Sequence, residues 1–98
     1  MTQSADEQPV RAHVVLYGHV QGVGFRAFAA RTASSLDLSG GVRNLDDGRV
    51  ELEVEGMKPV IEAFVQQLKG GPPAGRVTEI ETAWSRADGR YSTFSVWY

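Results

Sequence analysis

Apolar and polar positions change their spacing several times along this 98-residue chain. Residues 11–17 form an apolar, β-branched run that stops at Gly18, which predicts a central strand. From Phe25 onward, apolar residues recur at helical spacing, which predicts a helix that begins near Gly24. Residues 49–56 alternate valine or leucine with glutamate, the pattern of a strand with one face in solvent.

The second half of the chain carries one more apolar stripe at helical spacing. It follows Pro59, a residue suited to the first turn of a helix, and stops at the Gly70-Gly71 pair. Alternation and turn residues predict the other segments: strands at 39–44, 76–84 and 92–98, and turns at 46–48, 70–75 and 86–90. The order β-α-β-β-α-β, with a short C-terminal fifth strand, predicts an α+β fold of the ferredoxin-like sandwich type. In that fold an antiparallel sheet has both helices on one face.

Length and composition limit the organisation of the chain. Ninety-eight residues, 42% of them hydrophobic, suffice for one small core. Residues 1–9 are polar and are predicted to form a disordered tail, with residues 10–98 as the single domain. The N-terminus lacks the basic and apolar regions of a signal peptide, and no apolar run approaches the roughly 20 residues needed to cross a bilayer. We therefore expect a cytoplasmic protein without membrane contact.

Charge and cysteine content disfavour several function classes. The chain has 10 basic and 12 acidic residues, a net charge of −2, and the tail residues Asp6 and Glu7 account for the excess. This balance argues against a nucleic-acid partner, and residues 49–56 offer glutamates where an RNA-binding ferredoxin-like domain needs aromatic side chains. The absence of cysteine fits a reducing cytosol and rules out thiolate nucleophiles. With only two histidines, a zinc site would need carboxylate ligands, so we expect no metal.

The segment 18–27, GHVQGVGFRA, places three glycines and Arg26 between the first strand and the first helix. Its GVGFRA portion formally matches the G-x-G-x-x-A dinucleotide fingerprint, but the parallel βαβ sheet that this fingerprint needs does not fit in so short a chain. The Walker pattern is absent because no Lys-Ser/Thr pair follows the glycines. A phosphatase loop with a cysteine nucleophile is excluded because the chain contains no cysteine.

Two interpretations of this glycine-rich segment remain: a cradle for a phosphate or carboxylate group, and a plain β-α turn with a solvated arginine. Several backbone N–H groups converge at a helix N-terminus, where the helix dipole favours an anion. Arg26 in the first helical turn is unfavourable unless an anion neutralises it, and a local conflict of this kind is typical of functional sites. The side chain of Gln21 is predicted to bond within the loop.

Two motifs, GHVQGVGFR and the later GGVRNLDDGRVELEVEG, closely resemble the acylphosphatase family, which hydrolyses carboxyl-phosphate mixed anhydrides. The resemblance covers residues 11–98 and includes GPP before the fourth strand and FSVWY at the end. It implies that Arg26 binds the phosphoryl group and that Asn44 orients the attacking water. It also implies that the loop backbone supplies further donors to the phosphate, from His19, Val20, Gln21, Gly22, Val23 and Gly24.

The resemblance further implies a small acyl phosphate as substrate, a monomer, and neither metal nor cofactor. The chain departs from the family pattern at two positions. Gly41 stands where the family often has tryptophan, which predicts looser packing beside Asn44, and Trp97 replaces a residue that is commonly basic. A second candidate function stays open, a non-catalytic domain that holds a phosphoryl or carbamoyl phosphate ligand. Such a domain serves larger carbamoyl-transfer proteins.

Overall fold

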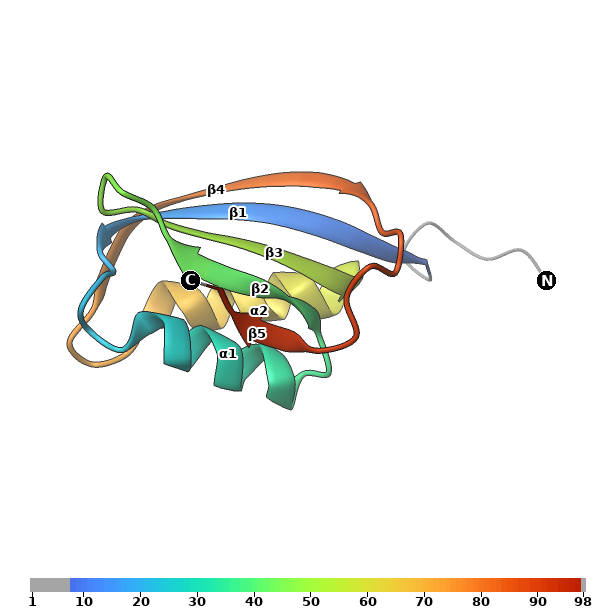
Figure 1. The fold of residues 1–98 in the computed structure, drawn as a ribbon, viewed down its shortest axis with the longest axis horizontal. Helices are drawn as coiled ribbons and strands as arrows, with labels where there is room; N and C mark the ends of the chain where they lie inside the picture. The colour runs from blue at the N-terminus through green and yellow to red at the C-terminus, as the bar shows by residue number, and fades with distance from the viewer. Residues whose placement is uncertain (1–7, 98) are drawn as a thin grey trace.

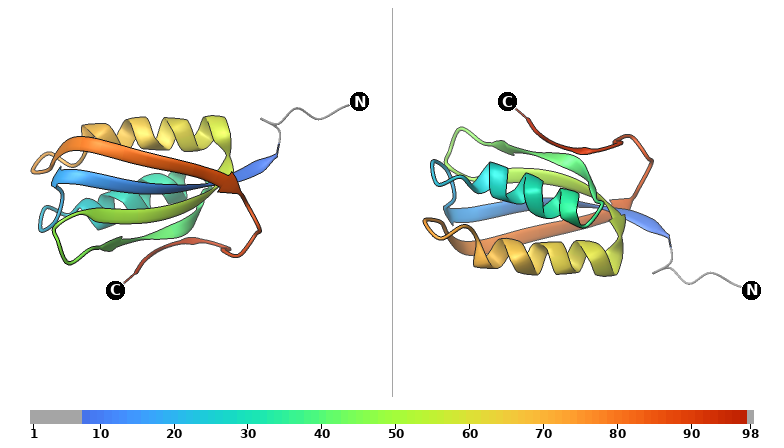
Figure 2. Two further views of the ribbon diagram at one scale, coloured as in Figure 1. Left: turned by 90° about the horizontal axis from the view of Figure 1, so that it is seen from above. Right: turned by 90° about the horizontal axis from the view of Figure 1, so that it is seen from below.

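Both helices lie on one face of a five-stranded sheet in the structure, a computed structural model that describes residues 8–97 (Figure 1). Seen from below, the two helices run side by side in front of the strands (Figure 2). In chain order the elements are β1 (Pro9–His19), α1 (Phe25–Ser35), β2 (Ser39–Asn44), β3 (Val50–Met57), α2 (Lys58–Gly70), β4 (Arg76–Arg86) and β5 (Phe94–Val96).

The strands lie in the order β4-β1-β3-β2-β5. β1 pairs antiparallel with both β3 and β4, and β2 pairs antiparallel with β3. β5 runs parallel to β2, with Phe94 opposite Gly40 and Val96 opposite Val42, which makes the sheet mixed at this edge. The predicted α+β ferredoxin-like fold with a short fifth strand is confirmed.

Strand alternation directs apolar side chains of β1 and β3 to the face that the helices cover. These side chains are fully buried: Ala12, Val14, Leu16, Val50, Leu52 and Val54. Phe64 of α2 joins the same core and forms an edge-to-face ring pair with Phe94 of β5, with ring centroids 6.0 Å apart. Fully burying an aromatic or aliphatic side chain of this size stabilises a fold by about 1.5–3 kcal/mol. The core therefore fixes β5 as well as the longer strands.

The bounds of β1, β3, β4 and β5 differ from the prediction because pairing partners, rather than local sequence, set them. β1 begins at Pro9, one residue inside the predicted tail, and β4 continues to Arg86 alongside it. β5 covers only Phe94–Val96, since it pairs with just three residues of β2. The predicted disorder is wrong at Pro9, which pairs with Met57, and stays a prediction for residues 1–7, which lie outside the described part of the chain.

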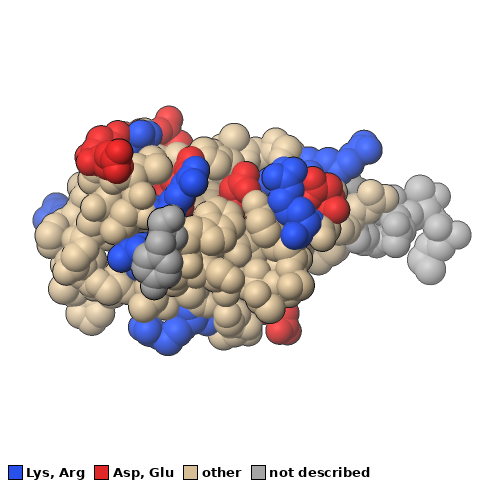
Figure 3. Space-filling model, viewed as in Figure 1, with Lys and Arg blue, Asp and Glu red and all other residues tan. Residues whose placement is uncertain are grey.

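The face of the sheet away from the helices carries charged pairs. Nε2 of His13 lies 2.7 Å from a carboxylate oxygen of Glu51. Arg11 donates to Glu55 at 2.8 Å and to Asp88 at 2.6 Å. Glu55 is only 5% exposed, so the glutamate row predicted to be solvated is solvated only in part. On the surface seen in Figure 3, basic and acidic side chains are interspersed rather than gathered in one patch of a single sign.

Gly41 and Trp97 meet on this same face. Gly41 pairs with Glu53 of β3, and a Cβ atom built on Gly41 would overlap the indole ring of Trp97. The ring thus occupies the space that a larger residue at position 41 would fill. The space at position 41 is therefore filled by the indole of a neighbouring chain segment, whereas the predicted looser packing beside Asn44 stays a prediction.

Candidate active site

The loop between β1 and α1 takes a conformation that needs glycine. Gly22 and Gly24 have φ angles of 74° and 77°, in the left-handed region that other residues adopt only at a cost. Nothing lies within 4 Å of a Cβ atom built at either position, so the loop backbone is open on that side. Gly24 caps α1, and its carbonyl accepts a hydrogen bond from the Phe28 N–H at 3.0 Å. The predicted helix start near Gly24 is confirmed.

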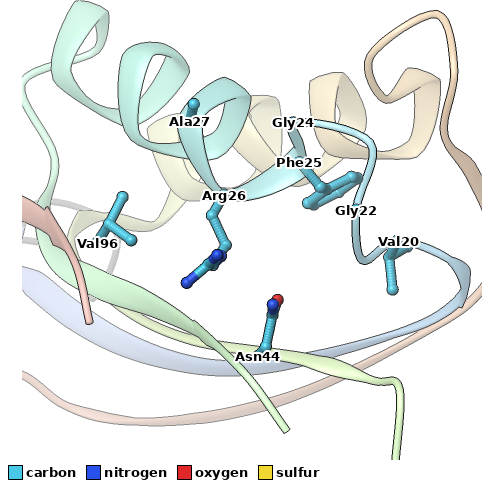
Figure 4. Close-up of a pocket in the computed structure, with 8 residues that line it drawn as sticks. All are labelled: Val20, Gly22, Gly24, Phe25, Arg26, Ala27, Asn44 and Val96. Atoms are coloured by element: carbon cyan, nitrogen blue, oxygen red, sulfur yellow. The ribbon is translucent and has the colours of Figure 1, made fainter. Parts of the chain in front are cut away.

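A pocket of about 230 Å³ lies where this loop, the first turn of α1 and the end of β2 meet (Figure 4). One water molecule takes about 30 Å³ in the liquid, so the pocket has room for a phosphoryl group together with a water. The residues that line it are Val20, Gly22, Gly24, Phe25, Arg26, Ala27, Asn44 and Val96.

Arg26 and Asn44 point into the pocket from opposite sides (Figure 4). Arg26 is half-buried in the first turn of α1, and Asn44 is the last residue of β2. The Oδ1 atom of Asn44 is buried and has no hydrogen-bond partner among the described residues. Leaving a buried acceptor unpaired costs about 1–3 kcal/mol, so this oxygen favours a donor that enters the pocket, such as a water.

The charges around the pocket suit an anion. The first turn of α1 contains no acidic residue, and no carboxylate is among the described residues that line the pocket. The N-terminus of α1 adds N–H groups without intrahelical partners and the positive end of the helix dipole. Asp47, in the turn after β2, instead accepts bonds from the N–H of Arg49 at 3.2 Å and from its Nε at 2.7 Å. The backbone bond from Arg49 is the main cause that lowers the pKa of Asp47. The Asp47 carboxylate therefore stabilises the β2–β3 turn.

Gln21 connects the two halves of the site. Its side-chain Nε2 donates to the carbonyl of Leu45 at 2.7 Å and to the carbonyl of Arg49 at 2.9 Å. Both carbonyls belong to the turn that directly follows Asn44, so the prediction that Gln21 bonds within its own loop is wrong. The bonds cross to the β2–β3 turn because the fold brings the two loops together at one end of the sheet.

The pocket brings together five of the residues predicted for the site: Val20, Gly22, Gly24, Arg26 and Asn44. The other three loop residues do not line it: His19 is exposed, Gln21 bonds to the turn, and Val23 packs against the core. Sequence reasoning missed Phe25, Ala27 and Val96. Phe25 and Ala27 line the pocket because they are the chain neighbours of Arg26 in the first turn of α1. Val96 reaches the pocket only because β5 pairs with β2.

Residues 8–97 contain no group of three or more His, Asp or Glu side chains placed to hold a metal ion. None of the helices in this part of the chain is long and apolar enough to span a membrane.

Comparisons with known proteins identify the family of the chain. The acylphosphatase family model matches residues 12–96. An acylphosphatase of Anaeromyxobacter sp. (strain Fw109-5) is 46% identical over 86 residues, which cover 88% of this chain and 92% of that protein. The crystal structure of acylphosphatase from Bacillus subtilis matches with a TM-score of 0.88 and 39% identity, over 91% of this chain and 99% of that one. The crystal structure of T. kodakarensis HypF matches with a TM-score of 0.78 and 38% identity, over 89% of this chain and 12% of HypF. The chain belongs to the acylphosphatase family.

Proposed function

We propose that this chain hydrolyses the carboxyl–phosphate bond of small acyl phosphates, with Arg26 and the loop backbone binding the phosphoryl group and Asn44 orienting the attacking water. Family membership supports the general activity. The observation that carries the division of roles is the pocket that the Arg26 guanidinium and the Asn44 carboxamide enter from opposite sides, the Asn44 oxygen being buried and without a partner in residues 8–97.

The phosphoryl group carries spread negative charge, and the site offers matching positive charge. A planar guanidinium can donate to two phosphoryl oxygens at once. The N–H groups at the start of α1 add donors and the positive end of the helix dipole, and the open glycine backbone lets an anion come close. Catalysis of this reaction then rests on positioning and on electrostatic stabilisation.

In the proposed step, a water bonded to Oδ1 of Asn44 attacks phosphorus in line with the leaving carboxylate oxygen. The new P–O bond forms as the bond between phosphorus and the acyl oxygen breaks, and the electron pair leaves with the carboxylate. Because a carboxylate is a weak base, no general acid is needed. No described carboxylate lines the pocket to act as a base, so the proton of the water passes to a phosphate oxygen. The products are a carboxylate and inorganic phosphate.

A non-catalytic phosphoryl or carbamoyl phosphate-binding domain is the second candidate. The match to T. kodakarensis HypF covers 12% of that protein, so this fold also occurs as a small part of a larger chain. The same pocket would serve either role, so turnover separates them.

The test is an assay of a model acyl phosphate with the purified chain, in buffer containing an excess of chelator. We expect hydrolysis to continue at an unchanged rate in chelator, because the proposed chemistry uses no metal or cofactor. We also expect inorganic phosphate to inhibit competitively, since product and substrate present similar oxygens to one cradle. Phosphate binding without turnover would favour the second candidate, and activity restored only by added Mg²⁺ would contradict the metal-free mechanism. We further propose that the enzyme is a cytoplasmic monomer.

A further inference from the structure

Gly41 is a glycine for reasons of space and not of backbone conformation. Its φ lies outside the left-handed region, whereas the preceding Gly40 has a φ of 138°. A Cβ atom on Gly41 would overlap Cε2, Cζ2 and Nε1 of Trp97, all atoms of one indole ring. Position 41 is therefore small because the side chain at position 97 rests on it.

Trp97 connects the end of β5 to the sheet through a backbone hydrogen bond and a ring contact. Its backbone N–H donates to the carbonyl of Val42 at 2.7 Å, and its ring lies against that of Tyr91, with centroids 5.7 Å apart. β5 is the edge strand, and β2 is its single neighbour in the described sheet. So short an edge strand depends on side-chain contacts at its ends to stay in place.

The residue before Trp97 belongs to the pocket. Successive residues of an extended chain point to opposite faces, so while Trp97 covers the helix-free face, Val96 points to the face that carries the site. Val96 lines the pocket together with Arg26 and Asn44, and Figure 4 draws it beside the guanidinium. α1, which carries Arg26, also packs on β5.

We propose that Trp97 is a positioning residue for phosphate binding: by resting on Gly41 it holds Val96 beside Arg26 and so limits the positions that the guanidinium can take. The inference rests on the proposed role of Arg26. Asn44 is held independently, since it pairs with Val50 of β3. Loss of the Trp97 contact should therefore affect anion binding more than the step that uses the water.

The test compares Trp97→Ala with the matched control Trp84→Ala, which truncates an indole that is 40% exposed on β4. Calorimetric titration gives the Kd of inorganic phosphate, and steady-state kinetics give KM and kcat for a model acyl phosphate. For Trp97→Ala we expect Kd and KM to rise roughly 2- to 10-fold, the range for losing the preorganisation of one long side chain, with kcat within about twofold. Trp84→Ala should leave all three constants unchanged.

Two further variants approach the contact from the other strand. Gly41→Ala should expel the indole and reproduce the rise in Kd, whereas Gly41→Trp combined with Trp97→Ala should refill the space from β2 and restore most of the phosphate affinity. These variants also cover the case in which Trp97→Ala does not fold. A fall in melting temperature for the folded variants with the Kd of phosphate unchanged would overturn the proposal, because Trp97 would then be only structural. If the variants weaken phosphate binding but even the parent chain hydrolyses no acyl phosphate, the positioning role stands and the proposed function fails.

Discussion

Arg26 and Asn44 face each other across one pocket, but the chain supports them in different ways. Arg26 stands on the first turn of α1, after a loop that contains two glycines with positive φ. Asn44 ends β2 and pairs with Val50, so it belongs to the hydrogen-bonded sheet. One group is therefore placed by a loop and a helix end, and the other by a strand.

The difference matches two separate chemical tasks. A helix N-terminus with an open glycine backbone brings donors and positive charge to an anion. A strand end can hold a neutral carboxamide in one place without adding charge beside the phosphate. Gln21 bridges the two supports through its bonds to Leu45 and Arg49. Binding of the anion and attack by the water should therefore be separable by substitutions on one side of the pocket or the other.

Removing the guanidinium should have the largest effect. Arg26→Ala is expected to weaken phosphate binding and kcat/KM together, by roughly 30- to 1000-fold, because it deletes a charge-assisted bidentate donor. Arg26→Lys should recover little, since an ammonium cannot reproduce the planar fork. Phosphate titration and steady-state kinetics measure both quantities. The matched control is Arg31→Ala, on the exposed side of the same helix. Phosphate affinity that survives in folded Arg26→Ala would show that the loop backbone alone binds the anion.

Truncating the carboxamide should separate attack from binding. Asn44→Ala is expected to lower kcat roughly 10- to 100-fold, the effect of losing one hydrogen bond to a polarised water, while the Kd of phosphate stays within a few-fold. Asn44→Asp should be worse, because a carboxylate also repels the phosphate. Circular dichroism must first establish that both variants are folded. If Asn44→Ala abolished phosphate binding and left kcat near normal, the two supports would not divide the work as proposed.

The elements whose residues follow one period were predictable from sequence. Residues 11–17, 39–44 and 50–56 lie in strands, and the helix that follows Gly24 begins where the period changes. Each of these patterns depends only on the residues of its own segment, so it can be recognised without knowing the contacts with the rest of the chain. The presence of Arg26 and Asn44 in one pocket was predictable through their two motifs, because the family resemblance supplies the long-range information that spacing lacks.

Contacts between distant segments were not predictable in the same way. Val96 reaches the pocket only through the parallel pairing of β5 with β2, and Gly41 is filled by Trp97 only in the folded sheet. Glu55 belongs to an alternating polar row but is buried, because Arg11 and the backbone N–H of Asp88 bond to it. An alternating pattern predicts which face of the sheet a side chain lies on. It does not predict which other side chains or backbone groups cover that face in the folded protein.

Removing the Gln21 hydrogen bonds that connect the β1–α1 loop with the β2–β3 turn should have an intermediate effect. Gln21→Ala removes two hydrogen bonds, each worth about 0.5–1.5 kcal/mol, so the free energy of unfolding should fall by about 1–3 kcal/mol. We expect kcat/KM to fall several-fold as the loop and the β2–β3 turn move independently. Chemical denaturation and kinetics measure the two effects. Gln66→Ala, the same change at an exposed position of α2, is the control. If Gln21→Ala and Gln66→Ala had the same unfolding free energy and the same kcat/KM, the Gln21 hydrogen bonds would not position the loop or the turn.

The smallest effect is expected behind Asn44, on the helix-free face of the sheet. Glu51 bonds to His13 at 2.7 Å and to Nε of Arg43, the neighbour of Asn44, at 2.7 Å. The bond to His13 is the main cause that lowers the pKa of Glu51 below 4.5, the bond to Arg43 adds to it, and burial opposes both. A lowered carboxyl pKa contributes stability that is fully present above the pKa of the unfolded state and is lost as the pH falls through the pKa of the folded state.

Glu51→Gln should therefore lower the unfolding free energy at pH 7 by up to about 1 kcal/mol, and the difference from the parent chain should shrink below pH 4.5. Denaturation at several pH values checks this, with Glu62→Gln on the exposed face of α2 as the control. Because the pairing with β3 still holds Asn44, kcat and KM should not change, and a fall in kcat would mean that the strand support depends on this ion pair.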